Sequence, residues 1–566
     1  MAHQPMVGAE NRVFVNRTLN FNNIKMIGFD MDYTVATYNV PNLEGKAFEI
    51  VRERLISEKG YPPEIRALQF DPNFIIRGLI IDHERGNFLK VNRYGYVKKA
   101  THGTRPLTID EQKRIYDTRG IDLTDPRFYI IHTLFSLAEG CLFARLVDWF
   151  EQERRPVSFP ALFKDIRGMI DDTHQDGSLK GFVVREPQKY LIQDRKAVEA
   201  LKKFRHYGKK LALITNSDFE YSQAVMHYCF DPFLPKSNWH NLFHIVIVTS
   251  NKPNFFLHSQ KFLRVDPKTG LLSNFHGPLE LGGIYQGGNA RTFERDLGLQ
   301  PSEILYLGDH ILGDVITLKK TTGWRTGLVV QELATEVPAL ELNRDLQRQI
   351  NELMVEKDSL ENEVYEIKEE LWDKRENRPP ALEKKRDQLR ERIAVIDEKL
   401  TALIGEEQRR YNPFWGEVMR SGNEESRFAT IVERYACIYM ASIGNLSYYS
   451  PFKYFRPPRR YLAHDPLPLA LSETLFQPAP GEGKGKRKGK DSPRSPLSQP
   501  LGLGPISQGT PLPRSGQVRK PDPARQPSLP RQPEPTPKPG PERKPSRPAG
   551  RPTNRPPRGQ RRQRQA

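Results

Sequence analysis

The chain has 566 residues and a formal net charge of +18, from 87 Lys and Arg against 69 Asp and Glu. Residues 481–566 alone carry 21 basic and 5 acidic side chains, a net of +16, which leaves +2 for the first 480 residues. A uniformly basic body of the nucleic-acid-binding kind is therefore excluded. Three scattered cysteines exclude a disulfide framework or a zinc site, which suits a reducing compartment.

Neither a signal-peptide core nor a membrane span is predicted, because the first 25 residues lack an apolar stretch and no run of about 18 apolar residues exists. We expect a soluble, cytoplasmic protein. Residues 466–566 are predicted to be a disordered, Pro-rich basic tail, since 20 of the 47 prolines lie in 481–566 and large apolar side chains are almost lacking there.

Short apolar runs that end in acidic or hydroxyl residues are predicted to be strands of a parallel sheet buried on both faces. They are residues 24–29, 211–214, 243–248, 304–307 and 327–330. This pattern predicts an α/β fold with ligands at the carboxyl ends of the strands. About 175 residues separate the first two runs, far more than a crossover helix needs. We therefore expect a catalytic core from residues 1–34 and 196–337, and a large α+β cap from 35–195.

The C-terminal third has a different pattern. Apolar residues between 346 and 403 recur at spacings of three and four in a highly charged background, and Pro379 and Pro380 interrupt them. This heptad pattern predicts an antiparallel helical, coiled-coil hairpin over 338–408. The aromatic-rich residues 409–465 are predicted to form a helical segment that packs on the core.

Two acids follow the first predicted strand, Asp30 and Asp32 in the sequence GFDMDYT. Carboxylates at this spacing repel one another unless a cation lies between them, which favours Mg²⁺. One of them can attack phosphorus, and the other can protonate the leaving group and later activate water.

Three further motifs fall at predicted strand ends or beside them. Thr215 and Asn216 can donate hydrogen bonds to phosphoryl oxygens, and Lys252 offers a fixed positive charge. Asp309 and Asp314, in the sequence GDHILGD, fit a tightly turning metal loop. In this order the four motifs resemble those of the haloacid dehalogenase (HAD) superfamily.

The resemblance extends to residues 12–17, 28–34, 215–218, 283–288, 308–314 and 323–326. Together they resemble the cytosolic purine 5′-nucleotidases, the IMP/GMP-preferring type. The resemblance implies a Mg²⁺-dependent enzyme in which Asp30 is the nucleophile and Asp32 the acid and base. It implies that the metal is held by Asp30, the backbone carbonyl of Asp32, and Asp309. Asp314 becomes a supporting acid, and Thr215, Asn216 and Lys252 become phosphate contacts.

The same resemblance implies how the base is recognised. Phe135 would stack on the purine, Arg167 and Asp171 would read the base edge, and His174 and Lys180 would complete the substrate site. The guanidinium of Arg167 can donate to the 6-oxo and N7 acceptors of hypoxanthine or guanine. The alternatives are that Phe135 is a core aromatic and that, without the family context, Arg167 and Asp171 form an ordinary helix pair.

Five positions depart from the family pattern. Ser136 and Gln175 replace residues usual beside the base, and Leu312, His132 and Ile431 replace those of the nucleotide effector site. We therefore do not predict activation by ATP. The leading hypothesis is hydrolysis of purine nucleoside 5′-monophosphates by a homo-oligomer, with phosphate transfer to another nucleoside left open. The alternatives are a HAD phosphatase for another phosphometabolite and a weak nucleic-acid or polyanion binder acting through residues 481–566.

Overall fold

The computed structural model describes residues 7–116, 120–375 and 378–459, which all belong to one compact unit, Met1–Ala479. The tail predicted at 466–566 lies outside the described residues. The domain boundaries given above remain predictions.

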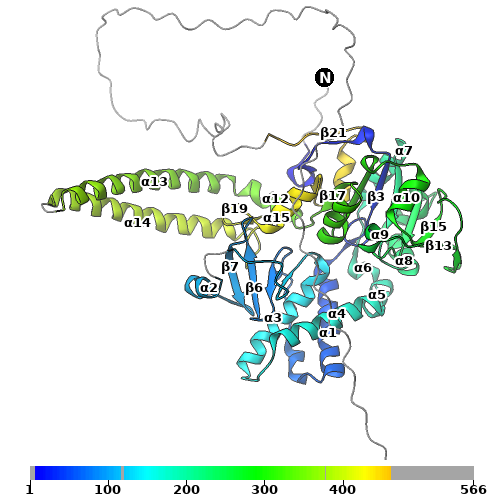
Figure 1. Ribbon diagram of the computed structural model, residues 1–566, viewed down its shortest axis with the longest axis horizontal. Coiled ribbons are helices and arrows are strands. Elements are labelled where there is room, and N and C mark those ends of the chain that lie inside the picture. Colours follow the sequence, from blue (N-terminus) through cyan, green and yellow to red (C-terminus); the bar gives the residue numbers. More distant parts are fainter. Residues whose placement is uncertain (1–6, 117–119, 376–377, 460–566) are drawn as a thin grey trace, which may run out of the picture. The chain divides into compact units, whose positions relative to one another are not determined.

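A ten-stranded mixed sheet organises the described residues (Figure 1). The strands from β20 to β15 run parallel, and the edge strands β1, β13 and β14 pair antiparallel. In spatial order the strands are β1 (Phe14–Val15), β20 (Ile438–Met440), β17 (Arg325–Val329), β16 (Ile304–Gly308), β3 (Met26–Phe29), β11 (Lys210–Ile214), β12 (Ile245–Val248), β15 (Ile284–Gly287), β13 (Phe262–Val265) and β14 (Leu272–Asn274). All five predicted strands are present, as β3, β11, β12, β16 and β17, so the α/β class is confirmed.

The central strand β3 and its two neighbours bring the polar residues that follow each strand close together. The register of β3 sets Phe29 opposite Leu213 of β11 and Leu307 of β16. The residues that follow these three strands therefore meet at one edge of the sheet. Gly28 makes room for this packing, because a Cβ there would lie 2.8 Å from the ring of Tyr306 in β16.

Helices cover the sheet because each has an apolar face. In α7, for example, Asp194 caps the first turn by accepting from two backbone N–H groups, and Leu201 and Phe204 are buried. These helices are α7 (Arg195–His206), α8 (Phe219–Phe230), α9 (Asn254–Leu257), α10 (Ala290–Leu297), α11 (Leu318–Thr321) and α12 (Leu333–Leu342).

Residues 35–195, between β3 and β11, contain a second, antiparallel sheet and further helices. The short strands β4 (Thr37–Tyr38) and β10 (Leu191–Ile192) pair at the two ends of this insertion. Its sheet has the order β8 (Arg105–Pro106), β7 (Val97–His102), β6 (Asn87–Val91), β5 (Ile80–Asp82) and β9 (Phe128–Ile130). Its helices are α1 (Val40–Lys59), α2 (Ile109–Tyr116), α3 (Leu137–Gln152), α4 (Phe159–Gln175), α5 (Ser178–Arg185) and α6 (Pro187–Tyr190).

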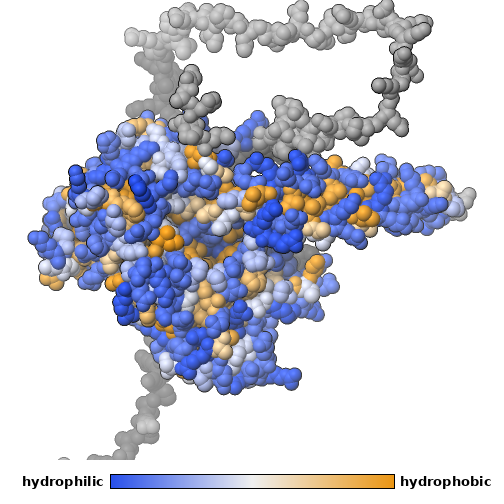
Figure 2. Space-filling view, turned by 180° about the vertical axis from the view of Figure 1, so that it is seen from behind, coloured by the Kyte–Doolittle hydropathy of each residue, from blue (hydrophilic) through white to orange (hydrophobic). Residues whose placement is uncertain are grey.

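Two long helices, α13 (Arg344–Asp373) and α14 (Pro380–Gln408), lie side by side (Figure 1). Lys357 occupies a position of the apolar seam, yet its ammonium group contacts Asp397 of the other helix at 2.5 Å, so its charge is paired. Figure 2 shows mostly hydrophilic residues on this pair, with hydrophobic ones towards the end nearest the sheets. The buried seam consists of Leu360, Val364, Ile367, Leu371, Leu389, Ile396 and Leu400.

The helical prediction for residues 409–465 is wrong in part. The described portion contains one α-helix, α15 (Arg427–Tyr435), together with strands. One of these, β20, joins the main sheet in parallel with β17, and its Ile438 and Met440 are buried while Tyr439 is half-buried. The others are β18 (Arg420–Ser421), β19 (Glu424–Glu425) and β21 (Tyr454–Phe455), which pairs with β2 (Leu19–Asn20).

Candidate active site

Three buried carboxylates meet where β3 and β16 end. Asp30, Asp309 and Asp314 each offer an oxygen, and these oxygens lie within 4.8 Å of one another. Asp314 belongs to a π-helical turn, Ile311–Thr317, and Gly308 makes room for it, since a Cβ at that glycine would lie 2.3 Å from the Asp314 carboxylate. Such π-helical turns are frequent at functional sites.

Lys252 supplies positive charge to this cluster. Its Nζ lies 2.8 Å from Asp30 Oδ1 and 3.0 Å from Asp314 Oδ1, and it donates to the Tyr306 hydroxyl at 2.8 Å. Burial alone lowers the pKa of Lys252, but the two carboxylates outweigh burial and raise it well above its usual range. One ammonium group therefore faces three carboxylates, and the cluster retains excess negative charge.

Burial and the surrounding negative charge raise the pKa values of the clustered acids. Burial, partly offset by Lys252, raises the pKa of Asp30 to about 6. Burial and then the charges of Asp30 and Asp314 raise the pKa of Asp309 well above its usual range. Asp309 Oδ2 is buried and has no hydrogen-bond partner. A buried, unpaired carboxylate oxygen among other carboxylates is the donor set that a divalent, oxygen-preferring cation fits.

Arg77, which lies between α1 and β5, holds the same loop from another side. Its buried guanidinium donates to the backbone carbonyl of Asp309 at 3.0 Å and to the Glu332 carboxylate at 2.7 Å. The chain that carries Asp309 is thus fixed by a residue from the insertion between β3 and β11. Sequence reasoning missed Arg77, because an isolated arginine far from the motifs gives no signal.

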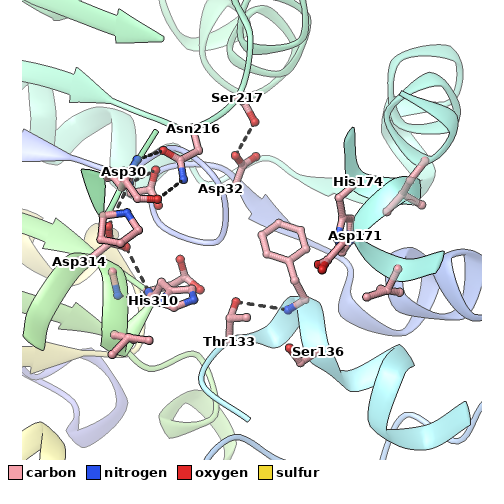
Figure 3. Close-up of a pocket in the computed structure, with 18 of the residues that line it drawn as sticks. Asp30, Asp32, Thr133, Ser136, Asp171, His174, Asn216, Ser217, His310 and Asp314 are labelled. Atoms are coloured by element: carbon pink, nitrogen blue, oxygen red, sulfur yellow. Dashed lines mark hydrogen bonds and ion pairs between the residues drawn. The ribbon is translucent and has the colours of Figure 1, made fainter. Parts of the chain in front are cut away.

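Asp32 lies apart from the three clustered acids and has its own hydrogen-bond donors. The Ser217 hydroxyl donates to Oδ2 at 2.8 Å (Figure 3). The Tyr38 hydroxyl donates to Oδ1 at 2.6 Å. The hydroxyl of Tyr221 lies 3.0 Å from that of Tyr38. Burial, and next the charge of Asp30, raises the pKa of Asp32, which favours the protonated form of this carboxyl group.

The loop after β11 contacts both Lys252, through Asn216, and Asp32, through Ser217. Asn216 accepts from the backbone N–H of Lys252 at 2.6 Å and donates to its carbonyl at 2.9 Å, so it fixes the chain that carries the lysine. Thr215 is fully buried, and its hydroxyl accepts from the backbone N–H of Ser217 at 3.1 Å. The side chain of Thr215 thus shapes the loop, whereas Asn216 and Ser217 line the cavity.

A second group of predicted residues comes from the insertion. The ring of Phe135 lies edge-on to Tyr33 and to His174, with centroids 4.6 and 5.3 Å apart. Burial lowers the pKa of His174 to about 4, so its ring is neutral near pH 7, and its Nε2 is buried without a partner. Lys180 donates to Asp218 at 2.6 Å.

The carboxylate–lysine cluster and the predicted residues of the insertion line one cavity of about 440 Å³. Figure 3 shows Asp30, Asp314 and His310 at one end, and Asp171 and His174 at the other. Of the twelve predicted site residues, all but Thr215 line it. Its lining is Asp30, Asp32, Leu43, Thr133, Phe135, Ser136, Arg167, Ile170, Asp171, His174, Leu179, Lys180, Asn216, Ser217, Tyr221, Lys252, Pro253, Asp309, His310, Leu312, Gly313 and Asp314.

The model of the 5′ nucleotidase family matches residues 13–467. The chain belongs to the 5′-nucleotidase family. It is 28% identical over 478 residues to 5′-nucleotidase domain-containing protein 2 of Rattus norvegicus, and the match covers 81% of each chain. A predicted phosphoglycolate phosphatase of Haemophilus somnus 129pt, of known crystal structure, aligns with a TM-score of 0.24 and 15% identity, covering 54% of this chain and 86% of that one.

This 5′-nucleotidase is an enzyme that hydrolyses phosphate esters. Among its described residues, no helix is both long enough and apolar enough to span a bilayer. Several residues that support its cavity were missed from the sequence, namely Tyr38, Glu139, Ser217, Tyr221 and Tyr306. Ser217 could have been found, since it follows Thr215 and Asn216 in the same motif. Of the three departing effector positions, Leu312 lines the cavity, whereas His132 packs 6.4 Å from the His310 ring and Ile431 packs on the core.

Proposed function

We propose that this 5′-nucleotidase is a Mg²⁺-dependent, HAD-type enzyme that hydrolyses purine nucleoside 5′-monophosphates through an aspartyl-phosphate. The observation that carries the proposal is the single cavity with a carboxylate–lysine cluster at one end and an aromatic, arginine-containing surface at the other. Its volume is within the usual range for small-molecule sites. A nucleotide has the matching polarity, because its phosphate and its planar base lie at opposite ends.

The proposed reaction begins with Asp30. Its Oδ1 is occupied by Lys252 and by the backbone N–H of Met31 at 2.7 Å, which leaves Oδ2 to attack phosphorus. An Asp30–phosphorus bond forms, the ester bond to the ribose 5′-oxygen breaks, and Asp32 donates its proton to that oxygen. Water then attacks phosphorus, returns a proton to Asp32 and releases inorganic phosphate and free Asp30.

Asp30, Asp309 and the backbone carbonyl of Asp32 would hold Mg²⁺, with Asp314 as a supporting acid. The metal would supply positive charge that neutralises the phosphoryl oxygens. The unpaired Oδ2 of Asp309 and the excess negative charge of the cluster support this assignment. Lys252 supplies a second, fixed positive charge at the same end of the cavity, and Asn216 orients the chain that carries it.

At the other end, Phe135 would pack on the purine, and Arg167 and Asp171 would contact its polar edge. Arg167 lies between Glu139 at 2.9 Å and Asp171 at 3.4 Å, so its guanidinium is already oriented. The neutral His174 and the ammonium of Lys180 complete this end.

Phosphate release tests the proposal. The purified protein should release phosphate from IMP and GMP faster than from AMP or ribose 5-phosphate, and EDTA should abolish the activity. Asp30→Asn should lose it, whereas Asp358→Asn, at an exposed position of α13, should keep it. Activity in Asp30→Asn, or activity unaffected by EDTA, would refute the mechanism. A preference for a non-nucleotide phosphate ester would favour the alternative phosphatase.

A further inference from the structure

A buried glutamate that the proposed reaction does not use lies behind the arginine of the base site. Glu139 belongs to the first turn of α3, is 1% exposed and does not line the cavity. Its Oε2 accepts from Nη1 of Arg167 at 2.9 Å, and the same nitrogen donates to the Tyr129 hydroxyl. Arg167 itself, on the neighbouring helix α4, does line the cavity.

An ionised Glu139 would be costly to bury without the positive charge of Arg167 beside it. Burial raises the pKa of Glu139 to about 7, and Arg167 opposes that rise. The other oxygen, Oε1, is buried and has no hydrogen-bond partner. The charge of Arg167 is therefore what keeps the pKa of Glu139 from rising further, and the carboxylate in turn restricts where the guanidinium can lie.

The restraint also determines which donors remain for a ligand. A guanidinium has five N–H donors in a fixed plane. Nη1 is used by Glu139 and Tyr129, and Nη2 lies 3.4 Å from Asp171. Nε and Nη2 are therefore the nitrogens that can serve a base in the cavity. Held on both sides, Arg167 loses little further conformational entropy when a ligand binds.

We propose that Glu139 is a specificity-determining positioning residue, which acts through Arg167 to select 6-oxopurine nucleotides. The inference rests on the proposed function. A fixed guanidinium can donate to the 6-oxo and N7 acceptors of hypoxanthine or guanine, whereas the 6-amino group of adenine presents a donor to it. An arginine free to move could turn away from adenine and lose this discrimination.

The test compares kcat/KM for IMP, AMP and ribose 5-phosphate, the last of which lacks a base. The variants are Glu139→Gln, Arg167→Met and their double mutant, with Glu151→Gln as a matched control. Glu151 lies on the same helix but pairs with His102. Loss of the charged hydrogen bond should lower the IMP to ribose 5-phosphate ratio about tenfold in Glu139→Gln, mainly through KM. The preference for IMP over AMP should fall with it.

The double mutant separates positioning from a purely structural role. If Glu139 acts through Arg167, the double mutant should have the same ratio as Arg167→Met alone. An equal loss for IMP and ribose 5-phosphate in Glu139→Gln, or independent losses in the double mutant, would overturn the proposal. Glu139→Asp keeps the charge but shortens its reach, so it should lower the ratio too, and an unchanged ratio would overturn the proposal. Absence of IMP hydrolysis in the unmodified protein would instead refute the proposed function itself.

Discussion

Replacing Asp309 by asparagine should make the metal-free protein more stable. The three clustered carboxylates offer oxygens within 4.8 Å of one another. At an effective dielectric constant of about 20, two unit charges at that distance repel by about 3.5 kcal/mol. Asp309 faces Asp30 and Asp314, and the positive charges of Arg77 and Lys252 offset roughly one of these two repulsions. Asp309→Asn should therefore raise the free energy of unfolding by about 3 kcal/mol when the carboxylate is ionised.

The gain should depend on pH in a defined direction. The pKa of Asp309 is raised in the folded protein by burial and by its acidic neighbours. The folded state therefore retains a proton that the unfolded state loses, and the wild-type protein loses stability as pH rises towards the folded pKa. Asparagine has no such dependence. The stability difference between the variant and the wild type should therefore grow as pH rises above about 3.9, the usual pKa of an aspartate.

Thermal denaturation in EDTA at acidic and alkaline pH measures this difference, and repeating it with Mg²⁺ tests the metal. Mg²⁺ should raise the melting temperature of the wild type but not of Asp309→Asn, because a cation stabilises only the state that binds it. Asp358→Asn, which removes an exposed acid on α13, is the control. A variant that melts no higher than the wild type in EDTA at alkaline pH, or that responds equally to Mg²⁺, would refute the reasoning.

Three further predictions concern other parts of the molecule. Burial raises the pKa of Glu44 to about 8, so this group alone should cost about 1.4 kcal/mol of stability per pH unit between about pH 5 and 8; Glu44→Gln should flatten the fall in melting temperature over that range, and an unchanged slope would contradict this. Tyr38→Phe removes a donor that lowers the pKa of Asp32, so the alkaline limb of the kcat profile should move to higher pH while kcat falls; an identical profile would exclude the role. Leu389→Ala should destabilise the α13–α14 pair by about 2 kcal/mol or more in circular dichroism melts, with IMP hydrolysis retained at 25 °C; an unchanged melt would show that the seam contributes little.

The strands and their polar ends could be predicted because both depend on local sequence. Continuous apolar runs such as β12 indicate burial on both faces, and the acids that follow β3 and β16 stand directly after such runs. Strand β20 escaped prediction because it has only three residues and lies among aromatic residues that suggested helices.

The contacts that complete the cavity could not be predicted, because they join elements distant in sequence. Ser217 lies 185 residues from Asp32, and Arg77 lies 232 residues from Asp309. No periodicity or spacing marks a hydrogen bond between two loops. Glu139 is a similar case, since an acid in the first turn of a helix is ordinarily interpreted as a favourable interaction with the helix dipole.

The α13–α14 pair has a topological consequence for how this enzyme can vary. It is inserted between β17 and β20, which are adjacent, parallel strands of the main sheet. Its two ends meet, because Arg410 donates to the side chain of Asn343 at 2.6 Å and Asn343 donates to the backbone of Glu407 at 3.1 Å. The α13–α14 pair can therefore be shortened, lengthened or replaced by a tight turn without moving a strand of the main sheet. Its length can change independently of the site residues that follow β3, β11 and β16.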